Sequence, residues 1–223
     1  MSDVPVLSGR ELTYRHADGA RTVTALCGVS LALRRERLTV VVGPSGSGKT
    51  TLLTLLGLLR TPDEGLVAMH GTDTTALAHR ARAALRARLG LAFQEPRFLD
   101  GLDLLDNVGY GLVPRGVRRA ERRRLAYAAL DRVGLAACAT QESRRISGGE
   151  RRRAGLARAL VTSPDALLVD EPTSGLDPDT AAAIAAELET ERRRGAALLV
   201  VTHDPAHFPG AAEDVRLRAG RRV

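Results

Sequence analysis

The sequence predicts an α/β fold in which helices cover both faces of a mainly parallel sheet. Short apolar runs alternate with helical patterns before residue 96 and again after residue 150. A glycine-rich turn separates one of these apolar runs from the helical pattern that follows it. Between 96 and 150 helical patterns follow one another without strands, which indicates an inserted helical lobe.

The first part of the chain has the pattern of two strands joined by a tight turn. Residues 6–16 and 21–33 are rich in strand-forming residues, and Asp18-Gly19 between them suits a hairpin. An antiparallel β region is therefore expected at the N-terminus. The next expected elements are a strand at 37–43, a helix at 49–60 stopped by Pro62, a strand at 65–71, a helix at 76–90 and a strand at 89–95.

The rest of the chain begins with the inserted lobe, in which helices are expected at 104–112 and 118–135. Strands and helices then alternate again, as in parallel sheets built from βα units. The elements expected there are a helix at 148–162, a strand at 166–170, a helix at 178–194, a strand at 195–204 and a small hairpin at 214–223.

The composition argues against several classes of protein. The longest apolar run, residues 51–59, is shorter than the roughly 18–20 residues that cross a bilayer. The start of the chain lacks the basic-then-apolar pattern of a signal peptide, so a cytosolic protein is expected. Cys27 and Cys138 lie far apart without metal-binding spacing and are expected to be reduced. The net charge of +7 permits phosphate-rich partners, but 3% aromatic residues argue against a base-stacking surface.

Residues 43–50, GPSGSGKT, have the spacing of a phosphate-binding loop between an apolar strand and a helix. The glycines let backbone N–H groups turn toward a phosphate, and the start of the helix favours negative charge. Lys49 is the only lysine among the 33 lysine and arginine residues. A compact ammonium fits inside a loop closed around phosphate, where a planar guanidinium would crowd it. The residues expected to bind nucleotide here are Gly43, Pro44, Ser45, Gly46, Ser47, Gly48, Lys49, Thr50 and Thr51, with Thr50 also a ligand of Mg²⁺.

A pair of carboxylates ends a later apolar strand, ALLVDE at residues 166–171. Asp170 is expected to hold Mg²⁺, either directly or through water. Glu171 lies one residue further, where it could orient and deprotonate an attacking water. Together with the phosphate loop, this pair predicts hydrolysis of a nucleoside triphosphate.

A second anion-binding site is predicted at ISGGE, residues 146–150, because Ser147, Gly148 and Gly149 stand at the start of a helix. One ATP cannot easily use both this helix start and the phosphate loop if the two lie far apart. A head-to-tail dimer resolves the difficulty, since the SGG of each copy would close over the ATP of the other.

With these motifs the chain resembles the nucleotide-binding subunit of ABC transporters over its whole length. GPSGSGKTT looks like Walker A, ALLVDE like Walker B, and ISGGE like the signature motif usually written LSGGQ. Gln94 in AFQEP matches the Q-loop, SGLD at 174–177 the D-loop, and His203 in VVTHD the switch histidine. Tyr14 stands where the family stacks an aromatic ring on adenine.

The resemblance implies a role for each of these residues. Gln94 would contact Mg²⁺ or the attacking water and link to the helical lobe. His203 would hold the γ-phosphate and position Glu171, and Asp177 would bridge to the phosphate loop of the partner. The remaining histidines are interpreted as surface or structural residues: His16, His70, His79 and His207.

Several residues depart from the family pattern. Ile146 replaces the usual leucine, and Glu150 replaces glutamine. The glutamate variant occurs in the subfamily of lipoprotein release, macrolide export and antimicrobial-peptide export, which residues 77–95 also resemble. The arginine clusters at 118–124 and 192–194 are interpreted as solvated faces rather than docking sites.

The resemblance also implies a fold and a function. A single ABC ATPase domain would combine a RecA-like P-loop NTPase core, residues 1–95 and 151–223, with a helical signature subdomain at 96–150. It would bind ATP and Mg²⁺, and dimerise on ATP with an identical copy or a paired ABC subunit. Hydrolysis would drive a separate integral membrane permease from the cytoplasmic face of the cell membrane.

Two other functions are compatible with the motifs. One is a non-transport ABC ATPase that signals across the membrane, as in the cell-division type. The other is a nucleic-acid-associated ABC ATPase, which the net charge permits. Low aromatic content and the lack of a long insert before ISGGE argue against the second, so no nucleic-acid partner is expected. The cargo and the direction of transport do not follow from the sequence.

Overall fold

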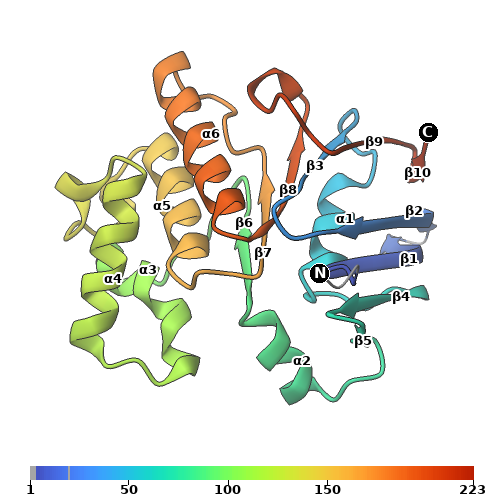
Figure 1. The fold of residues 1–223 in the computed structure, drawn as a ribbon, viewed down its shortest axis with the longest axis horizontal. Coiled ribbons are helices and arrows are strands. Elements are labelled where there is room, and N and C mark those ends of the chain that lie inside the picture. Colours follow the sequence, from blue (N-terminus) through green and yellow to red (C-terminus); the bar gives the residue numbers. More distant parts are fainter. Residues whose placement is uncertain (1–3, 20) are drawn as a thin grey trace.

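The computed structural model describes residues 4–19 and 21–223, whose strands form two sheets (Figure 1). The smaller sheet has the order β2-β1-β4-β5 and is antiparallel throughout. Its strands are β1 (Leu7–Asp18), β2 (Arg21–Leu33), β4 (Glu64–Met69) and β5 (Thr72–Asp73). The predicted N-terminal hairpin is confirmed by the pairing of β1 with β2, although residue 20 of its turn lies outside the described residues.

The larger sheet has the order β10-β9-β3-β8-β7-β6. Every neighbouring pair from β9 to β6 is parallel, and only the terminal strand β10 runs antiparallel to its neighbour. The mainly parallel sheet predicted from the alternating pattern is therefore confirmed. Its strands are β3 (Leu38–Val42), β6 (Leu89–Ala92), β7 (Ala166–Asp170), β8 (Ala197–Thr202), β9 (Glu213–Arg218) and β10 (Arg221–Arg222).

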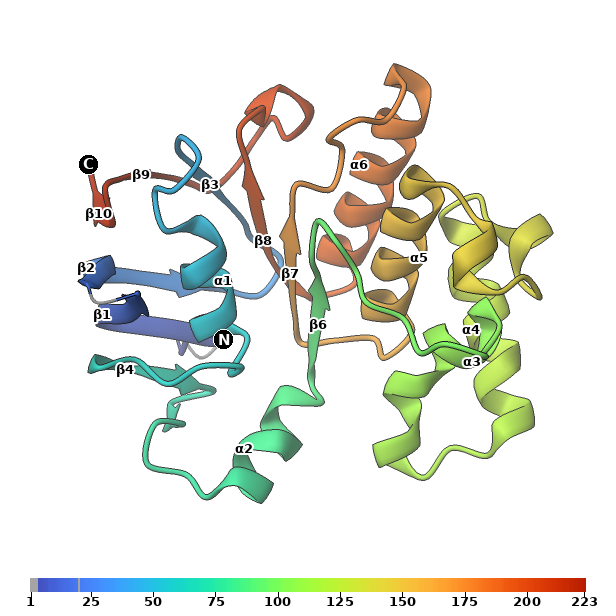
Figure 2. The same ribbon diagram turned by 180° about the vertical axis from the view of Figure 1, so that it is seen from behind.

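Helices lie on both faces of this sheet, with α1 on one side and α5 and α6 on the other (Figure 2). The α-helices are α1 (Lys49–Leu56), α2 (His79–Arg86), α3 (Leu104–Gly109), α4 (Arg119–Arg132), α5 (Gly148–Leu160) and α6 (Pro178–Arg193). The 3₁₀ helices are η1 (Tyr110–Arg115), η2 (Ala136–Cys138), η3 (Ser143–Arg145) and η4 (Pro205–His207).

Several predicted helices are shorter than the sequence pattern suggested, and for two of them the structure shows the reason. The helix expected at 49–60 ends at Leu56, because Leu58 takes a left-handed conformation with φ 57° and cannot continue it. The helix expected at 76–90 covers only His79–Arg86, since the chain must extend again to enter β6 at Leu89.

The core is divided between the two faces of the parallel sheet by alternation along each strand. In β3, Val40 belongs to the cluster under α4, α5 and α6, whereas Val41 belongs to the cluster around α1. In β8, Leu198 and Leu199 divide in the same way. Burying such a side chain contributes about 1.5–3 kcal/mol, so both faces need a helix to cover them.

The helical stretch between β6 and α5 is joined to the core by a partly buried ion-pair network. Arg132 at the end of α4 binds the carboxylates of Glu187 and Glu191 on α6, and Glu191 is buried. Burial lowers the pKa of Arg132, but hydrogen bonds and charges from the two glutamates outweigh it and raise that pKa overall. Cys27 and Cys138 are both free, as expected.

Candidate functional site

The carboxyl ends of the parallel strands meet at one edge of the sheet, where they border an open cleft of about 470 Å³. Ligand sites of α/β proteins characteristically lie at this edge. Gln94 follows β6, Asp170 ends β7 and His203 follows β8, so three separate strands deliver residues to it. The predicted site residues that line the cleft are Ser45, Gly46, Gly48, Lys49, Thr50, Thr51, Gln94, Asp170, Glu171 and His203.

The loop between β3 and α1 is folded back on itself. Gly48 has φ 100°, and a Cβ there would lie 2.4 Å from the carbonyl oxygen of Ala25, so only glycine fits. Lys49 donates from Nζ to the carbonyl oxygens of Gly43 at 2.6 Å and Pro44 at 3.0 Å. An ammonium has three donors. One donor therefore stays available to a phosphate oxygen in the cleft.

Gly43, Pro44 and Ser47 are predicted loop residues that do not line the cleft. A Cβ at Gly43 would lie 2.3 Å from the carbonyl oxygen of Leu217, so this glycine permits close packing against β9. Ser47 is buried, and its Oγ has no hydrogen-bond partner among the described residues. These residues therefore contribute to the conformation of the loop rather than to the surface of the cleft.

Thr50 and Asp170 place two oxygens beside each other at the start of α1. Thr50 Oγ1 donates to Asp170 Oδ2 at 3.1 Å. Burial raises the pKa of Asp170, and the neighbouring charge of Glu171 adds to the rise, against the hydrogen bond from Thr50. A hydroxyl and a carboxylate are hard oxygen ligands of the kind that Mg²⁺ prefers, so this pair fits that ion.

Glu171 is held in a strained and well-bonded position next to Asp170. Its φ is 49°, a left-handed conformation that costs a non-glycine residue on the order of 1–3 kcal/mol. Its Oε1 accepts the backbone N–H of His203 at 3.0 Å and lies 2.9 Å from His203 Nδ1. Its Oε2 accepts from Thr202 Oγ1 at 3.1 Å. The end of β8 therefore fixes the carboxylate on both oxygens.

Tyr14 is not among the residues that line the cleft. Its hydroxyl accepts a hydrogen bond from Arg60 at 2.8 Å, and the Arg60 guanidinium lies 5.2 Å from the centre of its ring. His16 and Val23 line the cleft instead. The β1–β2 pairing shifts register between Tyr14 and Arg15. The family pattern pointed to Tyr14, and His16 was interpreted as a surface or structural residue, so His16 was missed.

Ser147, Gly148 and Gly149 do not line the cleft of their own chain. Ser147 is exposed and caps α5, and its Oγ accepts from the N–H of Glu150 at 3.3 Å. Glu150 Oε2 accepts in return from Ser147 N and Oγ, both at 2.7 Å, which completes a capping box. The backbone hydrogen bond from Ser147 lowers the pKa of Glu150. The helix start is thus exposed and built on a rigid cap.

Asp177 is also exposed and lies outside the cleft. Its Oδ1 accepts from the N–H of Thr180 at 2.9 Å and caps α6, which lowers the pKa of Asp177. Residues 147–149 and Asp177, which also lie outside the cleft, both stand at the starts of core-packed helices, α5 and α6.

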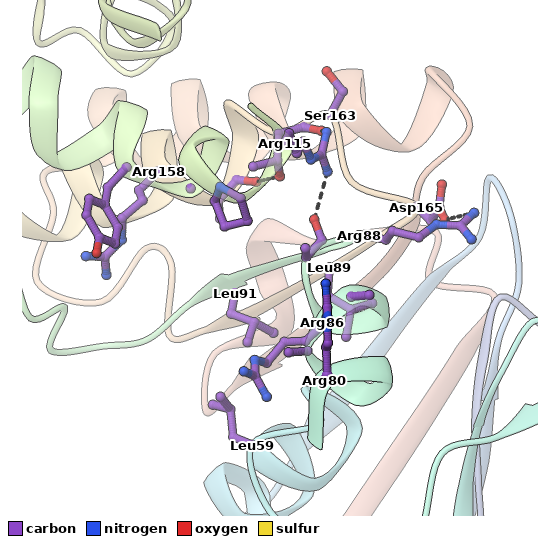
Figure 3. A pocket seen from close by; sticks show the side chains of 18 residues that line it. Leu59, Arg80, Arg86, Arg88, Leu89, Leu91, Arg115, Arg158, Ser163 and Asp165 are labelled. Atoms are coloured by element: carbon purple, nitrogen blue, oxygen red, sulfur yellow. Dashed lines mark hydrogen bonds and ion pairs between the residues drawn. The ribbon is translucent and has the colours of Figure 1, made fainter. Parts of the chain in front are cut away.

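A second groove, of about 1160 Å³, lies between α2 and the end of α5 (Figure 3). Leu59 and Tyr110 are apolar residues on its wall with exposures of 47% and 54%. Asp165 is the one acid among the described residues that line it, and it pairs with Arg88 at 2.6 Å. The arginines that line it are Arg80, Arg86, Arg88, Arg115 and Arg158. The groove is therefore apolar in part and carries an excess of positive charge.

Residues 26–174 match the family model described as ABC transporter. The chain belongs to the ABC transporter family. This ABC protein is 41% identical to the lipoprotein-releasing system ATP-binding protein LolD of Pseudomonas syringae, a match over 100% of this chain and 99% of that protein. It is 44% identical to the phosphate import ATP-binding protein PstB 2 of Natronomonas pharaonis, over 79% of this chain and 65% of that protein.

Among solved structures, a dimeric post-hydrolysis state of the ATP-binding cassette MJ0796 bound to ADP and Pi resembles this ABC protein with a TM-score of 0.91. The two chains are 29% identical, and the match covers 97% of each. The fold is therefore that of a P-loop ATPase cassette, as predicted. The protein is the ATP-binding and ATP-hydrolysing subunit of an ABC transporter. In the described part of the chain, no helix is both long and apolar enough to cross a membrane.

Proposed function

We propose that the cleft holds ATP with its phosphates on the loop 43–48 and its γ-phosphate toward Glu171 and His203. The observation that carries this proposal is the convergence of Lys49, Asp170 and Glu171 in one cleft, although they lie up to 122 residues apart in sequence. A volume of about 470 Å³ suits a small-molecule ligand. Backbone N–H groups of the loop and the free donor of Lys49 bind phosphate oxygens.

Thr50 and Asp170 would hold Mg²⁺, which spreads the negative charge of the phosphates when it is bound. Gln94 lies in the same cleft and would contact the ion or the attacking water. The base lies toward His16 and Val23 on the β1–β2 wall. We propose no role for Tyr14 at the base, because Arg60 engages both its ring and its hydroxyl.

The reaction is in-line attack of water on the γ-phosphorus. The water oxygen bonds to phosphorus, the bond from phosphorus to the β–γ bridging oxygen breaks, and ADP and inorganic phosphate leave. Glu171 orients the water and accepts its proton. His203 holds the Glu171 carboxylate in this orientation through the hydrogen bonds between the two residues. Catalysis therefore consists mainly of positioning and electrostatic stabilisation.

A second subunit completes the site. Ser147 is exposed and Gly149 is half-buried at the positive end of α5, and both lie outside the cleft of their own chain. In a head-to-tail dimer they would meet the γ-phosphate bound by the partner, with Asp177 next to the partner's phosphate loop. ATP would then close the dimer and hydrolysis would open it. Residues 96–150 would act as a helical signature subdomain beside a core formed by 1–95 and 151–223.

The arginine-rich groove is where we propose that a separate membrane permease binds, from the cytoplasmic face of the membrane. Exposed Leu59 and Tyr110 offer an apolar surface, and the surrounding arginines favour a segment that carries acidic residues. The match to LolD over the full length of the chain favours a permease of the subfamily that includes lipoprotein release.

The test is capture of the partner in the native host. Tagged Glu171→Gln subunit is purified from solubilised membranes with ATP present, and the proteins that copurify are identified. We expect a polytopic membrane protein, whose capture falls for Leu59→Asp but not for Tyr127→Asp, an equally exposed control on α4. Recovery of soluble proteins or nucleic acid alone would contradict the transport function and leave the ATPase activity standing.

A further inference from the structure

Arg152 joins three segments that are far apart in sequence. It lies on α5, one turn beyond the helix start at Ser147. Its Nε donates to the carbonyl oxygen of Gln94 at 3.3 Å, and its Nη1 donates to the carbonyl oxygen of Ser174 at 2.6 Å. One guanidinium therefore connects the helix that presents Ser147 to a residue of the ATP cleft and to the loop that leads to Asp177.

The packing around Arg152 is close on both sides. Gly175 has φ 69°, and a Cβ there would lie 3.0 Å from Arg152 Nη1, so the guanidinium rests against the backbone of the loop before Asp177. One turn further along α5, a Cβ at Gly155 would lie 2.8 Å from Pro96. The segment that carries Gln94 thus packs against α5 through a glycine and through Arg152.

We propose that Arg152 is a positioning residue that transmits occupancy of the ATP cleft to the surface that meets the second subunit. The proposal rests on the proposed function, in which Gln94 contacts the ATP site and Ser147 and Asp177 face the partner. Arg152 touches neither ATP nor the reacting atoms. It fixes the spacing of the exposed helix start and of the Asp177 loop relative to Gln94.

This arrangement requires arginine, because its planar fork presents donors in two directions and can reach both carbonyl oxygens at once. Lysine at this position would reach one of them. Arg151 provides a matched control on the same helix. Its Nη1 donates to the carbonyl oxygen of Ser143 at 3.0 Å, and its guanidinium lies 5.8 Å from the Phe98 ring, so its contacts stay within residues 96–150.

The experiment measures two ATP titrations on the full chain in a Glu171→Gln background. Binding of a fluorescent ATP analogue to dilute protein reports the cleft, and light scattering reports dimerisation. For Arg152→Ala we expect unchanged analogue binding and about a tenfold higher ATP concentration at half-dimerisation, equivalent to about 1.4 kcal/mol. Arg152→Lys should fall between Arg152→Ala and the parent, and Arg151→Ala should match the parent.

Several outcomes would overturn the proposal. One is that Arg152→Ala dimerises at the same ATP concentration as Arg151→Ala. Another is that Arg152→Ala loses binding of the ATP analogue to the same extent as it loses dimerisation, because that result indicates a local structural role for Arg152. If Arg152→Ala does not fold, parental dimerisation of Arg152→Lys would decide against it. If the Glu171→Gln parent itself fails to dimerise with ATP, the head-to-tail dimer and the role of Arg152 both fail. If the parent dimerises with ATP and Arg152→Ala dimerises at the same ATP concentration, only the role of Arg152 is rejected.

Discussion

Glu171 and His203 contact each other at two points. Glu171 Oε1 accepts a hydrogen bond from the backbone N–H of His203 at 3.0 Å and lies 2.9 Å from His203 Nδ1. An ionised carboxylate only accepts hydrogen bonds, so the second contact is a hydrogen bond in the tautomer of His203 that carries a proton on Nδ1. Glu171 directly follows β7 and His203 directly follows β8, so the pair also joins the ends of two neighbouring strands of the sheet. The proposed general base is therefore held in place by residues of its own chain.

Replacing His203 with alanine should slow hydrolysis while ATP binding remains. General-base catalysis accelerates a reaction by about 10²–10⁴-fold, and a Glu171 carboxylate that is no longer held in orientation loses a large part of this. We therefore expect the rate of phosphate release to fall by about 10²-fold. Glu171→Gln should lose at least as much. His207→Ala is the control, since His207 lies on η4 outside the cleft. Equal rates for His203→Ala and His207→Ala would contradict the proposed role.

Lys49→Arg should abolish turnover although it keeps the charge. Nζ lies within 2.6 and 3.0 Å of two loop carbonyl oxygens, a space that a planar guanidinium exceeds. Loss of one preorganised charge-stabilising donor costs about 10²–10³ in rate, which phosphate release would measure. Normal turnover of the arginine variant would refute the geometric explanation for the single lysine.

The same lysine allows a direct test of where ATP binds. Lys49 is the only lysine in the chain, so an amine-reactive acylating reagent has only Lys49 and the α-amino group as primary amine targets. ATP should protect Lys49, while labelling of the α-amino group stays constant as an internal reference. Mass spectrometry of the labelled peptides would measure both. Equal labelling of Lys49 with and without ATP would place the phosphates elsewhere.

Asp170→Asn should stabilise the nucleotide-free protein at neutral pH while it abolishes hydrolysis. Burial raises the pKa of Asp170 in the folded state above its unfolded value, so the folded state binds this proton more tightly. The free energy of unfolding therefore falls as pH rises from the unfolded pKa to the folded one. Asparagine removes the buried charge, and its advantage in Tm should disappear in acid, where Asp170 is protonated.

Asp106→Asn should behave in the opposite way and serves as the control. The hydrogen bond from Arg119, with the charges of Arg119 and Arg123, lowers the pKa of Asp106 in the fold. Its charged form therefore stabilises the fold above the unfolded pKa, and this contribution is lost as pH falls through the folded pKa. Thermal unfolding across pH should show the two variants changing Tm in opposite directions at neutral pH. The same direction for both would contradict the assigned environments.

Much of this fold could be predicted because periodicity and turn residues act locally. The parallel strands, the loop 43–48 and the carboxylates after β7 each follow from short patterns in the sequence. That Lys49, Asp170, Glu171 and His203 meet follows from a general property of parallel sheets, whose strand ends share one edge. These residues could be assigned without knowing the packing.

Other features depend on tertiary contacts that leave no local pattern. The end of α1 at Leu56 depends on a left-handed Leu58, which the apolar run at 51–59 conceals. Arg152 stands in a run of three arginines, and nothing in that run indicates that its guanidinium reaches Gln94 and Ser174. In a chain so rich in arginine, composition obscures the residues with specific partners.

At the end of the cleft proposed to hold the adenine base, the structure and the sequence pattern favour different residues for stacking on the base. His16 lines the cleft, whereas the ring of Tyr14 lies under Arg60. Stacking of a base on an aromatic side chain is worth about 1–3 kcal/mol by alanine substitution. We therefore expect His16→Ala to weaken ATP binding by roughly tenfold or more, and Tyr14→Ala to weaken it less.

Tyr14→Phe distinguishes a role of the tyrosine ring from a role of its hydroxyl, because it keeps the ring and removes only the hydrogen bond from Arg60. Isothermal titration with ATP on the three variants would give the affinities, and GTP would report whether the base is read at all. If Tyr14→Ala weakens ATP binding strongly while Tyr14→Phe and His16→Ala do not, the tyrosine ring stacks on adenine after all. That result would require the Arg60 side chain to leave Tyr14 when ATP binds, because Arg60 contacts both the ring and the hydroxyl of Tyr14.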